Sequence, residues 1–258
     1  MKHRIVVKVG SNVLTRPDGK LDVTRMSALV DQIAWLRQEG YEVILVSSGA
    51  MASGRGELKV SHSLDSVEQR QLFSAVGQGK LIGLYYDLFR EFNIHVGQVL
   101  TMKENFQPGE QYENQRACMT VMLENEVLPI VNENDTVSVT ELMFTDNDEL
   151  SGLIAQMMKA ETLVLLSNID GIYDGHPDDA RSQIIPEVKP GTDLSQYIKE
   201  EKSAFGRGGM HSKYTTAQKV QQQGIRVIIA NGERDDILIN LVKDKKNVPH
   251  TEFIPCNS

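Results

Sequence analysis

Short apolar runs alternate with longer amphipathic segments along this chain. The runs are rich in Val, Ile and Leu and carry few polar residues, which is typical of strands buried on both faces of a sheet. They predict strands at residues 5–9, 43–46, 95–101, 128–131, 163–166 and 226–230. A further run at residues 251–254 predicts an added edge strand.

The segments between these runs have the periodicity of helices. Residues 23–39 place apolar side chains at a spacing of three and four, and Gly40 ends this segment. Three glycines inside residues 67–92 weaken the expectation of one continuous helix there. They allow close packing, either against a second copy of the chain or within the core. In all, the pattern predicts helices at residues 23–39, 67–92, 112–126, 146–159, 209–223 and 235–242.

Buried strands that alternate with helices predict a mainly parallel sheet covered on both faces. The expected fold class is therefore α/β, a three-layer α/β/α sandwich with a central mainly parallel sheet. The sequence contains no internal repeat, low-complexity tract or linker composition. We accordingly expect a single domain over residues 1–258.

Composition narrows the classes of partner. The chain has 258 residues, of which 40% are hydrophobic and 24% charged, and its net charge is −8. A protein that binds a nucleic acid duplex is usually basic, so a nucleic acid partner is not expected. No apolar run approaches the roughly 20 residues that span a membrane, and residues 5–7 are too short for a signal peptide. With only two cysteines, the chain is expected to be cytoplasmic.

Polar and glycine residues follow several predicted strands directly. Lys8 and Gly10 end the first strand, residues 47–50 follow the second, residues 132–135 follow the fourth, and residues 167–168 follow the fifth. Because ligands of open α/β sheets bind beyond the carboxyl ends of the strands, these segments are expected to converge on one site.

Each segment also has a plain structural interpretation. Lys8 is either a lysine on an edge strand that extends its amine to water or a cation that binds phosphate. Residues 47–56, rich in small side chains, either cradle an anion with backbone N–H groups or form a simple turn from strand to helix.

A third glycine-rich segment, residues 206–213, opens a predicted helix and carries Lys213 one turn inside it. The N-terminus of a helix favours phosphate groups, whereas the alternative is a flexible surface loop. The order of residues differs from the Walker A loop, and the chain lacks the dinucleotide-binding glycine fingerprint.

Two short clusters mix carboxylates with amides, at residues 132–135 and 145–148. Such a mixture suits a ligand that carries both signs of charge, although turns and helix caps use the same residues. Asp146 alone is as good a cap as a ligand. Asp135 and Asp148 are harder to explain as caps. The histidines and cysteines are scattered, so no metal ligand is predicted among the side chains.

As an ordered set, these pieces resemble the amino acid kinase family, and within it the glutamate 5-kinase branch. Each piece is weak alone, but together they run over nearly the whole chain. The matching segments are residues 7–10, 46–50, 75–78, 95–98, 129–135, 146–148, 208–210 and 212–213.

The resemblance implies that Mg²⁺-bound ATP donates a phosphoryl group to the side-chain carboxylate of L-glutamate, the first step of proline biosynthesis. It also implies a role for each matching residue. Lys8 and Lys213 would neutralise the transferred group, and Asp148 would orient both lysines. Glutamate would be bound by Ser48, Gly49, Asp135 and Asn147. The nucleotide would be bound by the same two lysines and by Gly10, Ser167, Asn168, Arg207, Gly208, Gly209 and Met210.

The resemblance also implies a homo-oligomer and feedback inhibition by L-proline. The chain is too short for the C-terminal PUA domain that many glutamate 5-kinases carry, so we expect none. Asn168 stands where the family often has aspartate and lacks that charge. Two alternatives stay open: a kinase of the same fold that acts on another carboxylate, a phosphate or a carbamate, and a non-catalytic binding protein.

Overall fold

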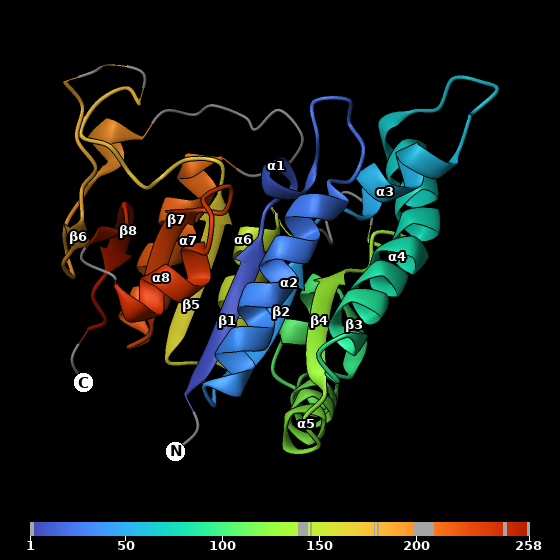
Figure 1. The fold of residues 1–258 in the computed structure, drawn as a ribbon, viewed down its shortest axis with the longest axis horizontal. Helices are drawn as coiled ribbons and strands as arrows, with labels where there is room; N and C mark the ends of the chain where they lie inside the picture. Colours follow the sequence, from blue (N-terminus) through green and yellow to red (C-terminus); the bar gives the residue numbers. More distant parts are fainter. Residues whose placement is uncertain are drawn as a thin grey trace.

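An eight-stranded sheet forms the centre of the part of the chain that the structure describes (Figure 1). The structure is a computed structural model, and it describes residues 3–138, 144, 146–177, 179, 181–198, 209–244 and 247–256. The strand order is β3-β4-β2-β1-β5-β7-β8-β6. The strands are β1 (Arg4–Val9), β2 (Glu42–Ser47), β3 (Val96–Thr101), β4 (Leu128–Glu133), β5 (Thr162–Ser167), β6 (Glu187–Val188), β7 (Arg226–Asn231) and β8 (His250–Phe253).

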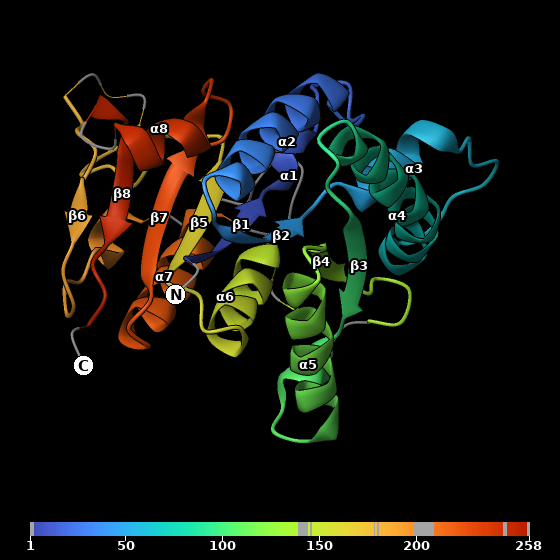
Figure 2. The same cartoon turned by 60° about the horizontal axis from the view of Figure 1, so that its bottom comes forward.

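Helices cover both faces of this sheet. The turned view shows α2, α4 and α8 on one face and α5, α6 and α7 on the other (Figure 2). The α-helices are α1 (Ser11–Leu14), α2 (Val23–Gln38), α3 (Ala50–Glu57), α4 (Ser66–Arg90), α5 (Glu110–Glu124), α6 (Asn147–Met157), α7 (Met210–Gln222) and α8 (Ile237–Lys243). Short 3₁₀ turns occupy Lys103–Phe106 and Ser195–Tyr197. The arrangement confirms the predicted three-layer α/β/α fold.

The alternation of side chains along the strands divides the interior into two cores. In β1, Val7 and Val9 join the core under α2, α4 and α8, whereas Val6 joins the core under α5, α6 and α7. Because side chains alternate with a period of two, Lys8 shares the face of Val6. The strand therefore directs this lysine toward the layer that contains α6 and α7.

The predicted parallel strands are present, but the structure differs from the sequence-based expectation at the C-terminal strand and at the segment after β2. Strands β3, β4, β2, β1, β5 and β7 are parallel, as expected. The run near the C-terminus, however, is not an edge strand, because β8 lies between β7 and β6. The segment 47–56 was expected to be a loop or turn, but most of it belongs to α3 (Ala50–Glu57), which begins after Gly49 at a φ of 107°.

Helix α4 is continuous in spite of its glycines. Its first turn is stabilised by a capping box. The Asp65 side chain accepts a hydrogen bond from the backbone amide of Glu68, and the Glu68 side chain accepts one from the backbone amide of Asp65. At Gly77, an added Cβ would lie 1.8 Å from the carbonyl oxygen of Ala50 in α3. A side chain at this position would therefore collide with α3, and Gly77 belongs to the interior. At Gly83, by contrast, an added Cβ would meet nothing within 4 Å.

Gly77 and Gly83 provide a matched test of this packing. We expect Gly77→Ala to lower the free energy of unfolding by about 1–3 kcal/mol, because α3 must shift to admit the methyl group. Gly83→Ala should raise it by about 0.5–1 kcal/mol, because alanine is the better helix former. Chemical denaturation of both variants measures the difference. Equal effects of the two substitutions would contradict the close contact between α3 and α4.

Candidate functional site

A cavity of about 1190 Å³ lies beyond the carboxyl ends of the central strands. Its walls come from the ends of β1, β2, β4 and β5 and from the first turns of α3, α4, α6 and α7. Strand β1 lies between β2 and β5, where the order of the sheet reverses direction. Open α/β sheets bind ligands at this topological position. The volume exceeds the roughly 300–1,000 Å³ of an ordinary small-molecule pocket, so the cavity has room for two reactants.

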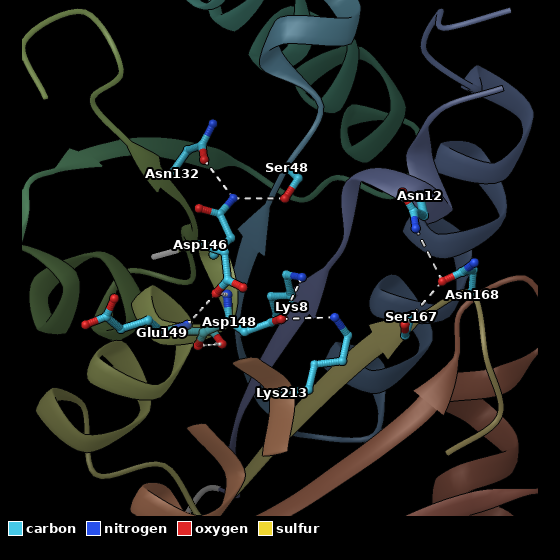
Figure 3. Close-up of polar contacts among 12 residues, drawn as sticks. Lys8, Asn12, Ser48, Asn132, Asp146, Asp148, Glu149, Ser167, Asn168 and Lys213 are labelled. Atoms are coloured by element: carbon cyan, nitrogen blue, oxygen red, sulfur yellow. Dashed lines mark hydrogen bonds and ion pairs between the residues drawn. The ribbon is translucent and has the colours of Figure 1, made fainter. Parts of the chain in front are cut away.

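Lys8, Asp148 and Lys213 meet at the floor of the cavity (Figure 3). The Nζ atom of Lys8 lies 2.6 Å from Oδ1 of Asp148, and the Nζ atom of Lys213 lies 3.0 Å from Oδ2. Asp148 is completely buried, whereas both lysines line the cavity. Two positive charges share one negative charge, so the cluster presents a net charge of about +1 to the cavity.

Three elements distant in sequence bring these charges together. Lys8 extends from the central strand toward the layer of α6 and α7. Asp148 lies in the first turn of α6, and Lys213 lies in the first turn of α7. The side chain of Asp146 caps α6 by accepting from the amides of Asp148 and Glu149, which confirms the expected cap. Lys8 is 5% exposed on an interior strand, so the interpretation as an edge lysine that reaches water is wrong.

Burial and neighbouring charge act on these groups in opposite directions. Burial lowers the pKa of Lys8 below its ordinary value, while Asp148 counteracts part of that shift. Burial alone would raise the pKa of Asp148, but the two lysines outweigh it and lower that pKa to about 2. Burial and the charge of Asp148 raise the pKa of Asp146. Asp148 therefore stays ionised at neutral pH and helps to keep Lys8 protonated.

Side-chain amide groups link α6, β4 and α4 beside the cavity. The Nδ2 group of Asn147 lies 3.0 Å from Oγ of Ser48 and 3.0 Å from Oδ1 of Asn132. Asn132 in turn donates to Oε1 of Gln78 in α4, at 3.0 Å. The two acidic clusters of the sequence are thereby joined, and Gly49 lines the cavity beside Ser48.

Asp135 lies in the loop after β4 and contacts α4. Its Oδ2 atom accepts a hydrogen bond of 3.0 Å from Ser74, and its Oδ1 atom lies 3.6 Å from Nε of Arg70. Arg70 also donates from Nη2 to the carbonyl oxygen of Ser138.

The sequence interpretation missed the contribution of α4. Arg70, Ser74 and Gln78 recur every four residues, so they share one face of the helix. This polar row within an apolar helix was the available signal.

The remaining predicted residues divide into two groups. Gly10, Ser167, Asn168, Gly209 and Met210 all line the cavity, whereas Arg207 and Gly208 lie outside the described residues. At Gly10, an added Cβ would lie 3.2 Å from Nζ of Lys8, so a side chain would crowd the lysine. Asn168 accepts a long hydrogen bond of 3.4 Å from Asn12, which connects the end of β5 to α1.

No group of three or more His, Cys, Asp or Glu side chains in the described part of the chain is arranged to hold a metal ion. Among the helices described, none combines the length and the apolar character that a membrane crossing requires.

The chain is similar to known proteins over most of its length. The profile of the amino acid kinase family matches residues 3–231. A glutamate 5-kinase of Bacteroides thetaiotaomicron is 66% identical over 252 residues, which cover 98% of this chain and 70% of the relative. A glutamate 5-kinase of Chlorobaculum tepidum is 49% identical and is covered over 69% of its length. A carbamate kinase from Giardia lamblia bound to AMP-PNP has a TM-score of 0.70 at 17% identity, covering 98% of this chain and 99% of that structure.

The pairing of Lys8 with Asp148 leads to a prediction about ionisation. Because Asp148 counteracts the effect of burial, Asp148→Asn should lower the pKa of Lys8 further. Lys213 and Asp146 also act on Lys8 and stay in place. An amine-specific acylating reagent, applied over a range of pH and followed by mass spectrometry, should then modify Lys8 at lower pH in the variant. The profile of exposed Lys59 is the internal control; an unchanged Lys8 profile would contradict the pairing.

Proposed function

We propose that this chain, which belongs to the amino acid kinase family, transfers the terminal phosphoryl group of ATP to the side-chain carboxylate of L-glutamate. The product is L-glutamyl 5-phosphate, and the reaction is the first step of proline biosynthesis. One observation carries the proposal: two lysines share a buried aspartate at the floor of a cavity that Asp135 also lines.

The chemistry of the acceptor fits the groups available. A glutamate side chain has a reference pKa near 4.3 and is already ionised at neutral pH, so transfer needs no general base. The difficulty lies in bringing an anionic carboxylate to an anionic phosphate. Phosphoryl transfer depends on positioning and on neutralisation of the charge that spreads over the transferred oxygens. Lys8 and Lys213 supply that charge from the floor of the cavity.

Asp148 acts through the lysines in this proposal. It is completely buried beneath them, so its role is to position two ammonium groups that would otherwise repel each other. One carboxylate oxygen holds each lysine, which sets the spacing of the two charges before substrate binds. Preorganised charge of this kind costs no rearrangement at the moment of reaction.

The substrate end of the cavity would recognise glutamate by its other charges. Asp135 would accept the α-ammonium group, while Asn147, Ser48 and Gly49 would hold the molecule along the wall. Gly10, Ser167, Asn168, Gly209 and Met210 would line the nucleotide side. Arg207 and Gly208 are assigned to that side by the family resemblance alone.

Magnesium enters this proposal with the nucleotide. Mg²⁺ gives up its water reluctantly and is bound in kinases through substrate phosphates together with one or two carboxylates. When present, it supplies further neutralisation of the phosphate oxygens. Asp146 and Glu133 also line the cavity, and their carboxylate oxygens are a donor type that suits this ion.

The proposal also includes a cytoplasmic location, a homo-oligomer and feedback inhibition by L-proline. Proline has the shape of a cyclised glutamate, so its site would overlap with that of the substrate.

A panel of acceptors tests the proposed reaction. ADP release should require L-glutamate and should not occur with L-aspartate, N-acetyl-L-glutamate or UMP. Trapping the product with hydroxylamine identifies the acyl phosphate. Turnover with only one of the other acceptors would assign a different kinase activity, and no turnover with any acceptor would favour a binding protein.

Lys213→Ala tests whether this lysine acts on the transferred phosphoryl group or on the bound glutamate. We expect kcat to fall roughly 100- to 1,000-fold, the usual loss for one group that stabilises transition-state charge, with a smaller change in the KM for glutamate. Lys219→Ala, an exposed lysine in the same helix, is the matched control and should leave kcat unchanged. An unchanged kcat in Lys213→Ala would remove Lys213 from the mechanism.

Asp135→Asn tests the substrate end. The KM for glutamate should rise roughly 10- to 100-fold, the equivalent of one charge-assisted hydrogen bond, because the α-ammonium loses its anionic partner. Steady-state kinetics at saturating ATP measures this effect. A rise confined to the KM for ATP would show that Asp135 lies on the nucleotide side.

A further inference from the structure

We propose that Arg70 binds the α-carboxylate of the amino acid substrate, so that Arg70 and Asp135 together select a zwitterionic α-amino acid. This inference rests on the proposed function, since it specifies how the same cavity recognises the non-reacting end of glutamate. Neither residue touches the transferred phosphoryl group in this arrangement.

Arg70 is a buried cation on the wall of the cavity. It lies in the second turn of α4, is 8% exposed and lines the cavity. The carbonyl oxygen of Ser138 accepts a hydrogen bond from its Nη2 group, which holds the guanidinium in place. A charge is costly to bury in this way unless it has a partner. Asp135, 3.6 Å from Nε, is one such partner.

The other described cations that line the cavity lie beside other groups. Among the described lysines and arginines, those that line the cavity are Lys8, Arg55, Arg70 and Lys213. Lys8 and Lys213 are held by Asp148 at the floor. Arg55 is exposed on α3, with its guanidinium 5.7 Å from the centre of the Phe73 ring. Arg70 is therefore the cation placed beside the carboxylate that would receive the α-ammonium group.

The pairing of Arg70 with Asp135 matches the charge pattern of an α-amino acid. The ammonium and carboxylate of glutamate are attached to one carbon, so the groups that bind them must also be neighbours. Nε of Arg70 and Oδ1 of Asp135 are 3.6 Å apart, longer than a direct N–H···O hydrogen bond. A zwitterion placed against the pair would set its carboxylate against the guanidinium of Arg70 and its ammonium against the carboxylate of Asp135. Guanidinium groups bind carboxylates with particularly good geometry.

The network on α4 explains how this end is held relative to the reacting end. Gln78, two turns beyond Arg70 on the same helix face, accepts from Asn132, and Asn132 accepts from Asn147. Asn147 precedes Asp148, which holds the two lysines. A rigid helix thus carries the recognition of the α-carbon group and connects it through two amides to the phosphoryl-binding cluster.

Two glutamate analogues separate this role from a merely structural one. 4-Aminobutyrate keeps the ammonium and the reacting carboxylate but lacks the α-carboxylate, whereas glutarate keeps both carboxylates and lacks the ammonium. The inhibition constant of each analogue against glutamate phosphorylation is measured for the unmodified protein, Arg70→Met and Asp135→Asn. Arg70→Lys is included as the conservative variant, and thermal unfolding monitors the fold of each protein.

We expect Arg70→Met to weaken glutamate and glutarate roughly 10- to 100-fold and to leave 4-aminobutyrate within about twofold, because that analogue has no α-carboxylate to lose a partner. Asp135→Asn should show the complementary pattern, weakening glutamate and 4-aminobutyrate but not glutarate. Arg70→Lys should restore part of the affinity for glutamate and glutarate.

Equal weakening of glutamate and 4-aminobutyrate in Arg70→Met would overturn the proposal, since it would show that Arg70 only positions Asp135. If Arg70→Met does not fold, Arg70→Lys decides: weakening confined to ligands with an α-carboxylate supports the proposal, and uniform weakening overturns it. Failure of the proposed function is a separate result, because the unmodified protein would then not phosphorylate glutamate at all.

Discussion

The contact of Asp148 with Lys8 and Lys213 is the interaction on which the rest of the site depends. Two lysines placed this close in a buried position repel each other, and burial already lowers the pKa of Lys8. A fully buried carboxylate with a pKa near 2 offsets both effects at neutral pH. Removing one partner of such a group leaves an uncompensated buried charge, which is strongly destabilising. The central strand and the starts of α6 and α7 are therefore held in register by the same charges that would act on the phosphoryl group.

Helix α4 is the second organising element. It presents Arg70 and Ser74 to the loop after β4, and Gln78 to Asn132 within β4. Further along, the hydroxyl oxygen of Tyr85 lies 2.8 Å from Oγ of Ser47 at the end of β2. Burial raises the pKa of Tyr85 to about 12, so its hydroxyl stays protonated. The close contact of α3 with α4 at Gly77 fixes this helix against the strand ends. Substrate recognition is thus placed on a rigid element.

Several site residues could be identified from the sequence, and others could not. Lys8, Asp148 and Lys213 follow strand ends or open helices, and the structure brings them together; their roles remain predictions for experiment. Arg70 escaped notice because a single arginine in a long helix has the sequence signature of a solvated face. Only the packing of α4 against the loop after β4 reveals that it is buried. Likewise, residues 50–57 are rich in glycine and small side chains, which local propensity assigns to a loop, yet contact with α4 makes them helical.

The layered α/β fold was predictable from local pattern, because apolar runs of strand length that alternate with helices are typical of a sheet covered on both faces. The same pattern also determined which segments end at the ligand-binding edge, since parallel strands bring their carboxyl ends to one side. Tertiary structure decided the pairings: that β8 lies inside the sheet, that Asp146 caps while Asp148 holds two lysines, and that Asp135 meets Arg70. These contacts join residues far apart in the chain, and local pattern carries no information about which distant partner a charge will meet.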